Sequence, residues 1–272
     1  MVKEEEKMIN LPQPPDDFYA GYTDQNIKLA RSIYESCIRK RNKVKTNYRT
    51  VISAFFSRGL EILESILLLV LNDRITDAGV LLRSLANLII NLGYIEKEKE
   101  KRSILFLCDA ATQHRKLYEK SRILFSAPGE AKVADSYILH YKKEEIKMQN
   151  IIDNKYTNST PWQNIKIAER AKAIPQNQYL YDLLYADLSR FEHHDFSAMR
   201  AYVDPNTCNP IIKTGSHRHS PVLNREGILM MSNIILGMIM ESFNGEYQLK
   251  WKDKIDEMAR KLATKEQLTP AS

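Results

Sequence analysis

The sequence contains little glycine. Only 9 of its 272 residues are Gly and 10 are Pro, whereas globular proteins average roughly 7% Gly. Glycine supplies the positive-φ positions of β-hairpins, bulges and nucleotide-binding loops. Its scarcity therefore argues against a many-stranded β protein and against a dinucleotide-binding fold. In agreement, neither GxGxxG nor GxxxxGK[S/T] occurs in the chain.

Cysteine and long apolar runs are also scarce. The three cysteines are widely spaced and form no CxxC pair, which argues against a disulfide framework and a cysteine-rich zinc site. The first residues are acidic and include no apolar signal-peptide segment. The most apolar run, residues 66–71, is too short to cross a bilayer. We therefore expect a cytoplasmic protein with no membrane partner.

What the sequence does contain is helical periodicity. The hydrophobic fraction of 43% is sufficient for a compact core, and the net charge is only +6. Apolar residues recur at helical spacing along nearly the whole chain. This pattern predicts a single all-α bundle of seven to nine helices around a central apolar helical hairpin. We expect a flexible leader over residues 1–22, one domain over 23–265 and a frayed tail over 266–272.

The expected helices follow from this periodicity and from capping residues. The first begins at Asp24 and continues through a basic run towards Phe55. The others cover residues 53–71, 78–97, 103–125, 133–153, 162–173, 177–202, 221–243 and 248–265.

Arg83 is the first residue that could carry a function. It lies in the second helix of the expected hairpin, between Leu82 and Leu85. Arginine is seldom buried unless it is paired. An antiparallel hairpin would bring Glu61 and Glu64 within its reach. Three interpretations follow: a buried ion pair that fixes helix register, a functional arginine facing a central pocket, or a surface residue.

A second polar cluster interrupts a later expected helix and contains Ser189, Glu192, His193 and His194. The imidazole of His193 lies four residues after the hydroxyl of Ser189, so that the two can touch on one helix face. Such groups suit proton transfer, although a polar girdle that only joins helices is the structural alternative. Adjacent histidines cannot bind one metal from a regular helix, and no HExxH occurs. We therefore expect neither a metal nor another cofactor.

A basic run is the third candidate, because six basic residues and no acidic ones lie over residues 39–49. The residues that would contact nucleic acid are Arg39, Lys40, Arg41, Lys43 and Lys45. Such a run can bind phosphates electrostatically. However, only Tyr48 could stack on a base, and charged runs on helices are usually solvated faces. Both interpretations stay open.

Two stretches of the sequence together resemble a known family. The first is TDAGVLLRSL from Thr76, followed by LGYI from Leu92. The second combines Pro161-Trp162, the sequence AERA from Ala168, and the segment of Tyr185 to His193. Over about residues 45–245 the chain resembles domain of unknown function 5677, a bacterial all-helical family. In this resemblance Arg83 matches the family's helix arginine, and His193 matches its histidine after the serine. Asn87 stands where the family usually has glutamate.

More loosely, the chain resembles the HEPN superfamily of helical ribonucleases found in toxin–antitoxin and antiphage systems. Those enzymes use an arginine and a histidine, spaced R-x4–6-H and often completed across a dimer, without a metal. The resemblance implies that Arg83 and His193 act on RNA while Glu192 and Ser189 orient the imidazole. Arg190 lies too close to His193 for that motif.

Two other functions stay open. One is a non-enzymatic helical interaction module, in which Arg83 and residues 189–195 are structural. The other is a basic nucleic-acid-binding protein. The partners that these hypotheses imply are RNA, a second copy of the chain or a partner protein of a defence system.

Overall fold

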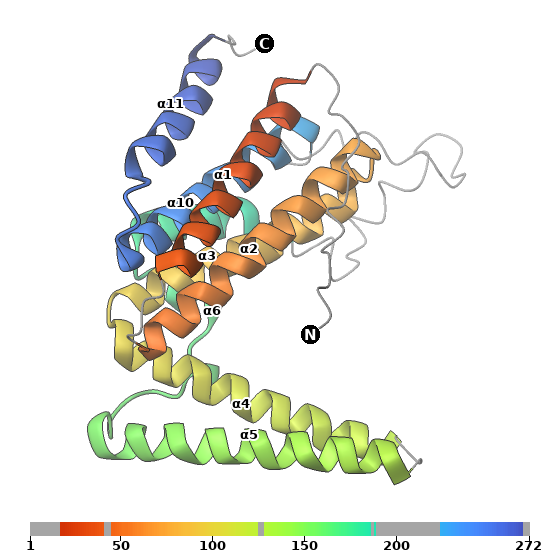
Figure 1. The fold of residues 1–272 in the computed structure, drawn as a ribbon, viewed down its shortest axis with the longest axis vertical. Helices are drawn as coiled ribbons and strands as arrows, with labels where there is room; N and C mark the ends of the chain where they lie inside the picture. The colour runs from red at the N-terminus through yellow and green to blue at the C-terminus, as the bar shows by residue number, and fades with distance from the viewer. Residues whose placement is uncertain (1–16, 41–44, 125–127, 186–187, 189–223, 269–272) are drawn as a thin grey trace. The chain divides into compact units, whose positions relative to one another are not determined.

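The computed structural model describes residues 17–40, 45–124, 128–185, 188 and 224–268 (Figure 1). Within these residues the chain forms nine α-helices and two short helical turns, and no strand. The predicted all-α class is therefore confirmed. The contacts group the chain into two compact units. Unit 1 takes residues 1–41, 56–86 and 183–272, and unit 2 takes residues 42–55 and 87–182. The single domain expected over residues 23–265 stays a prediction.

The nine α-helices are α1 (Phe18–Lys40), α2 (Asn47–Leu71), α3 (Ile75–Glu96), α4 (Lys99–Leu124), α5 (Pro128–Lys155), α6 (Ile167–Ala171), α7 (Pro175–Leu180), α10 (Arg225–Tyr247) and α11 (Lys252–Leu268). A 3₁₀ turn, η1, covers Trp162–Asn164, and a π-helical turn, η2, covers Tyr181–Tyr185.

Capping side chains explain why two helices begin earlier than the periodicity indicates. The Asp17 carboxylate accepts a hydrogen bond of 2.9 Å from the backbone N–H of Tyr19, so α1 begins six residues before Asp24. The hydroxyl of Thr46 accepts one of 3.1 Å from the N–H of Arg49, and α2 begins next to it. The first helix that we expected to continue through the basic run instead ends at Lys40.

The helix expected over residues 162–173 is wrong, because two short elements replace it. The backbone is extended at Ile165 and at Lys166, between η1 and α6. The guanidinium of Arg170 donates a hydrogen bond of 2.9 Å to the backbone oxygen of Trp162. This tertiary contact satisfies a carbonyl group that a continuous helix would have used itself.

In unit 1, α2 and α3 meet as the antiparallel hairpin that the sequence predicts. The turn between them is closed by a hydrogen bond of 2.8 Å from Arg74 N to Leu69 O, with Asp73 in the left-handed conformation. A Cβ placed on Gly59 of α2 would lie 3.7 Å from Cδ1 of Leu85 on α3. Since both residues are ten or more positions from the turn, the two helices run side by side along this part of their length.

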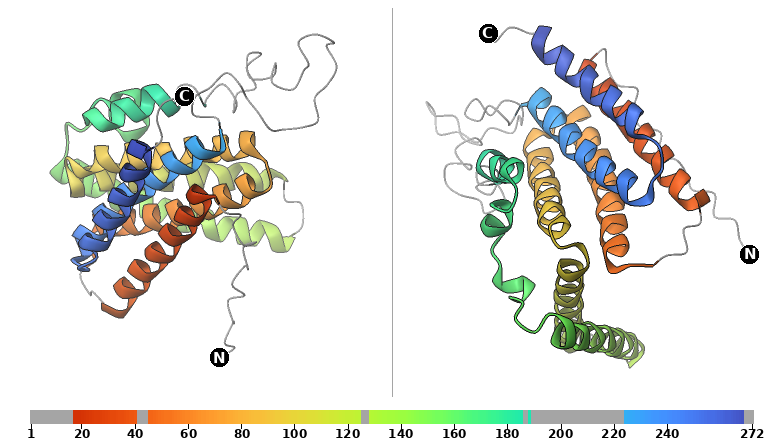
Figure 2. Two further views of the ribbon diagram at one scale, coloured as in Figure 1. Left: turned by 90° about the horizontal axis from the view of Figure 1, so that it is seen from above. Right: turned by 90° about the vertical axis from the view of Figure 1, so that its left-hand side faces the viewer.

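Helix α10 contacts both α1 and α11 within unit 1 (Figure 2). Phe243 of α10 stacks on Phe56 with ring centroids 4.2 Å apart, and both rings are fully buried. A buried polar bridge joins α1 to α10, because Asn233 donates a hydrogen bond of 2.7 Å to Thr23 and accepts one of 2.9 Å from Asn26. The core of this unit is therefore apolar, with a hydrogen-bonded seam inside it.

In unit 2, α4 and α5 lie antiparallel as a long hairpin (Figure 1). Trp162 of η1 is buried against Phe106 of α4, at a centroid distance of 5.1 Å, and against Tyr94 of α3, at 5.6 Å. These ring contacts pack the segment after α5, which carries η1, against α4 and the C-terminal part of α3.

Helices α3 and α10 are long and apolar enough to cross a membrane by length and composition alone. In the structure, 61% of the apolar window of α3 and 56% of that of α10 are buried. A core helix of a soluble protein passes the same test, so we draw no membrane topology from it.

Candidate functional site

Arg83 lies in unit 1, and its described partner is a tyrosine. Its guanidinium donates a hydrogen bond of 3.1 Å to the hydroxyl of Tyr185, and the guanidinium carbon is 4.5 Å from the centre of the same ring. Both side chains are half-buried. Tyr185 ends the π-helical turn η2, a kind of turn that is frequent at functional sites. The arrangement places the guanidinium of Arg83 against the last residue of η2.

The glutamates that we expected near Arg83 bind other arginines. Glu61 pairs with Arg58 at 3.1 Å, and Glu64 pairs with Arg31 of α1 at 2.9 Å. Both pairs involve partly exposed side chains. An Arg83–glutamate pair with these two partners is therefore wrong, since each carboxylate is bound elsewhere.

The remaining residues of the predicted catalytic set, Ser189, Glu192 and His193, lie outside the described residues, as does His194. Their prediction is untested. Along the chain His193 follows Tyr185 by eight residues.

The residues of the basic run differ in their contacts in the structure. Lys40 donates hydrogen bonds of 2.8 Å to the backbone oxygens of Tyr247 and Gln248, and so caps the C-terminus of α10. Arg39 pairs with Glu35 at 3.6 Å, and Lys45 is exposed. Arg41 and Lys43 lie outside the described residues. At least one of the five candidate residues thus has a structural role, and their contact with nucleic acid stays a prediction.

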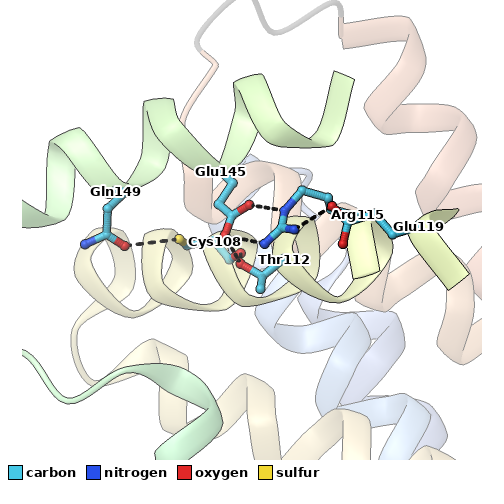
Figure 3. Close-up of polar contacts among 6 residues, drawn as sticks. All are labelled: Cys108, Thr112, Arg115, Glu119, Glu145 and Gln149. Atoms are coloured by element: carbon cyan, nitrogen blue, oxygen red, sulfur yellow. Dashed lines mark hydrogen bonds and ion pairs between the residues drawn. The ribbon is translucent and has the colours of Figure 1, made fainter. Parts of the chain in front are cut away.

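A cluster of polar side chains lies between α4 and α5 (Figure 3). The guanidinium of Arg115 binds Glu145 at 2.6 Å and Glu119 at 2.8 Å. Glu145 also accepts a hydrogen bond of 2.9 Å from the hydroxyl of Thr112. These hydrogen bonds lower the pKa of Glu145, chiefly through Arg115, so the carboxylate is charged at neutral pH.

Beside this cluster lies a pocket of about 430 Å³, walled by α4, α5 and the segment that carries η1. Its apolar wall comes from Leu105, Ile152 and Trp162. Its polar lining includes Cys108, Asp109, Thr112, Arg115, Lys116, Glu145, Gln149 and Asp153.

The Cys108 thiol of this pocket is poorly suited to nucleophilic catalysis. Its sulfur lies 3.8 Å from Oε1 of Gln149 (Figure 3). Burial raises the pKa of Cys108, and the negative charges of Glu145, Asp109 and Asp153 raise it further. A nucleophilic cysteine needs a lowered pKa. The pocket is therefore better suited to binding than to covalent chemistry.

No metal centre occurs in the part of the chain that the structure describes, since no group of three or more His, Cys, Asp or Glu side chains there could hold an ion.

Sequence reasoning missed the α4–α5 pocket entirely. Arg115 and Glu145 are thirty residues apart, on helices whose mutual register the periodicity does not fix. The one available signal was the amphipathic pattern of the helix expected over residues 133–153, which does not show which polar residues of a neighbouring helix it would face.

The fold defines the protein as an all-α protein with a helical hairpin at its sequence centre. The model of a family of unknown function, DUF5677, matches residues 49–210. Because this match covers more than half of the chain, the protein belongs to that family. No curated protein and no solved structure matches the chain.

Proposed function

We propose that this protein is a metal-independent ribonuclease of the reducing cytoplasm, acting in a toxin or antiphage defence system. The observation that supports it is the Arg83–Tyr185 pair, in which a half-buried guanidinium is oriented by a phenol hydroxyl at 3.1 Å. A guanidinium binds phosphate oxygens in a bidentate manner and stays charged at any physiological pH. Arg83 lies within the family match, as does His193.

In the proposed reaction Arg83 binds the scissile phosphate. His193 removes the proton of the ribose 2′-hydroxyl, and the 2′-oxygen attacks phosphorus. The bond to the 5′-oxygen then breaks and that oxygen takes up a proton, which leaves a 2′,3′-cyclic phosphate and a 5′-hydroxyl end. Arg83 stabilises the charge that develops on the phosphorane. Ser189 and Glu192 orient the imidazole.

The test is cleavage of a labelled RNA in the presence of a chelator, with the product ends identified by mass spectrometry. We expect cyclic-phosphate ends, and a loss of roughly 10²-fold or more in rate for His193→Ala. The matched control is His217→Ala, which removes another histidine of the chain and should leave cleavage unchanged. Equal cleavage by His193→Ala and the unmodified chain would show the mechanism to be wrong.

Tyr185→Phe separates a catalytic Arg83 from a structural one. This variant keeps the ring beneath the guanidinium but removes the hydroxyl that orients it. If Arg83 binds the phosphate, Tyr185→Phe should slow cleavage while the melting temperature changes little. A lower melting temperature with no RNA cleavage by any form of the chain would support the non-enzymatic alternative.

One observation favours that alternative, a helical interaction module. The α4–α5 hairpin exposes several large apolar side chains, which are Leu117, Ile123, Val133, Leu139 and Ile146. A contiguous patch of exposed apolar side chains is typical of protein-binding surfaces, whereas single ones are common on any surface. Light scattering of the intact chain, alone and after charge substitutions at these positions, tests whether a second copy binds there.

A further inference from the structure

Residues 113–147, which include parts of both α4 and α5, carry an excess of positive charge. They contain eight lysines and arginines and five carboxylates, which leaves a formal charge of +3, half of the +6 of the whole chain. Four of the carboxylates bind cations within these residues, namely Glu119, Asp135, Glu144 and Glu145. Five lysines form no ion pair among the residues that the structure describes, namely Lys116, Lys120, Lys132, Lys142 and Lys143. This surplus of positive charge attracts an anionic partner.

A stripe of exposed basic and polar side chains follows the outer face of α5. Its members recur every three or four residues and so share one helix face: Lys132, Ser136, His140, Lys143, Lys147 and Asn150. The buried residues of α5, from Ala134 to Ile152, lie on the opposite face. No carboxylate interrupts the stripe. Lys147 pairs with Glu144 at 3.5 Å, an exposed pair that solvent screens. The fifteen residues from Lys132 to Lys147 cover about 22 Å along the helix axis.

A stack of aromatic rings lies beside this stripe. Tyr118 of α4 stacks on both Tyr137 and Tyr141 of α5, with ring centroids 4.7 and 5.8 Å apart. His114 stacks on Tyr141 at 4.8 Å. Tyr137 is at one end of the stack, because Tyr118 is its one ring neighbour among the described residues, and its side chain is 43% exposed. A nucleic-acid base can extend such a stack at Tyr137.

Lysines and exposed rings together are the components of a surface that binds single-stranded nucleic acid. The cations bind backbone phosphates, and the rings stack on bases that a double helix would hide. Lys132 lies five residues from Tyr137, about 7.5 Å along the axis of α5. Its long, flexible side chain can therefore reach a phosphate next to a base that stacks on Tyr137. An acidic protein would use the lysines but has no need of the ring.

We infer that the outer face of α5 is a binding surface for single-stranded RNA, in which Lys132, Lys143 and Lys147 bind backbone phosphates and Tyr137 stacks on a base. The choice of RNA over DNA rests on the proposed function. The surface itself lies wholly in unit 2 and includes none of the residues of the proposed reaction.

Fluorescence anisotropy of a labelled 2′-O-methyl oligouridine tests this surface on the intact chain, because the methylated ribose has no hydroxyl to attack phosphorus. Binding should weaken steeply as salt is added. A triple variant with Lys132→Gln, Lys143→Gln and Lys147→Gln should reduce the slope of log affinity against log salt by about 2, since each phosphate contact on a single strand contributes about 0.7.

The matched control removes the same charge from exposed sites on α1 and α11. It combines Lys28→Gln, Lys252→Gln and Lys261→Gln, and it should leave the slope unchanged. Because all six lysines are exposed, neither triple variant depends on a substitution in the core. Equal changes of slope for the two triple variants would overturn the proposal.

Tyr137→Leu tests the stacking contact. It should weaken oligouridine binding about fivefold or more, the lower end for the loss of one base–aromatic contact. The control is Tyr179→Leu in α7, where the side chain is 62% exposed, and it should not change the affinity. Unchanged affinity for Tyr137→Leu would overturn the stacking contact and with it the proposal.

Other polyanions show whether the surface selects single-stranded RNA. Duplex RNA and polyglutamate should bind more weakly than the oligouridine, and oligodeoxythymidine should bind no more tightly. No binding of the oligouridine at low salt, or tighter binding of any of these competitors, would overturn the proposal. If the oligouridine binds but no RNA is cleaved, this surface stands and the proposed ribonuclease is wrong. If RNA is cleaved equally by the lysine variant and the unmodified chain, the ribonuclease stands and this surface is wrong.

Discussion

The two units differ in the hydrogen-bond partners of their buried polar side chains. In unit 1 the polar side chains of Thr23, Asn26 and Asn233 are buried and bind one another inside an apolar core. In unit 2 the buried side chain of Asn177 instead donates to backbone oxygens, and Arg170 lies over the ring of Trp162 at 4.0 Å. In the α4–α5 hairpin, an ion pair between Arg115 and Glu145 joins the two helices beside a pocket.

Because of this difference, we expect the core of unit 1 to contribute mainly to stability and the α4–α5 hairpin of unit 2 to contribute to binding. A closed core with internal hydrogen bonds resists changes of volume, because no space is left for a displaced side chain. A seam of charged side chains beside a pocket leaves room for a ligand at the cost of buried apolar area. We therefore expect large stability effects from core substitutions in unit 1 and smaller effects, with effects on binding, from polar substitutions in unit 2.

The largest effect should come from Phe243→Ala, which breaks the buried ring pair of unit 1. Phe243 is 1% exposed and stacks on Phe56, so the substitution leaves a cavity and should lower the free energy of unfolding by about 3–5 kcal/mol. Urea denaturation followed by circular dichroism measures this change. The control is Ile123→Ala in α4, where the side chain is 85% exposed, and the loss should stay below about 0.5 kcal/mol. Similar losses for both variants would contradict the contrast between the units.

A pair of helical glycines gives the next effect. A Cβ on Gly93 would overlap the side-chain amide of Asn177 and lie 2.7 Å from Cδ1 of Ile174. Asn177 is buried and donates to the backbone oxygens of Ile89 and Ile90. Gly93→Ala should therefore displace the Asn177 amide from these hydrogen bonds. We expect the free energy of unfolding to fall by about 1–2 kcal/mol, even after the gain in helix propensity.

Gly59→Ala is the matched variant in unit 1. Its Cβ would lie 3.1 Å from Cδ1 of Ile239, the far end of a flexible side chain. We expect a change within about 0.5 kcal/mol, because the gain in helix propensity offsets the small displacement. Thermal unfolding of both variants tests the pair, and a larger loss for Gly59→Ala than for Gly93→Ala would reverse our reading of the two units.

Periodicity and capping residues predicted the elements that depend on local sequence. The α2–α3 hairpin was predicted because two apolar stretches flank a short polar turn. The split of the segment after Pro161 could not be predicted, because it depends on the hydrogen bond of Arg170 to a carbonyl eight residues earlier. The contact of Arg83 with Tyr185 could not be predicted either, since Tyr185 lies 102 residues further along the chain. Contacts of this kind are set by packing, which overrides local propensity.

A smaller effect than those of Phe243→Ala and Gly93→Ala should come from Glu145→Gln, which removes the charge that binds Arg115 across the α4–α5 seam. Because Arg115 lowers the pKa of Glu145 below its ordinary value of 4.5, the ion pair contributes its full stability above pH 4.5. That contribution is lost as the pH falls through the lowered pKa. The difference between the unmodified chain and Glu145→Gln should thus be about 1 kcal/mol at pH 7 and shrink towards pH 3.

Glu257→Gln is the control for this pH dependence. Its partner Lys261 also lowers the pKa of Glu257, but both side chains lie exposed on α11, 2.9 Å apart. Solvent screens such a pair, so this variant should unfold like the unmodified chain at each pH. Urea titrations at several pH values between 3 and 7 compare the two variants. A pH-independent loss for Glu145→Gln would mean that Glu145 stabilises the hairpin through packing, and that the seam of unit 2 is closer in kind to the core of unit 1.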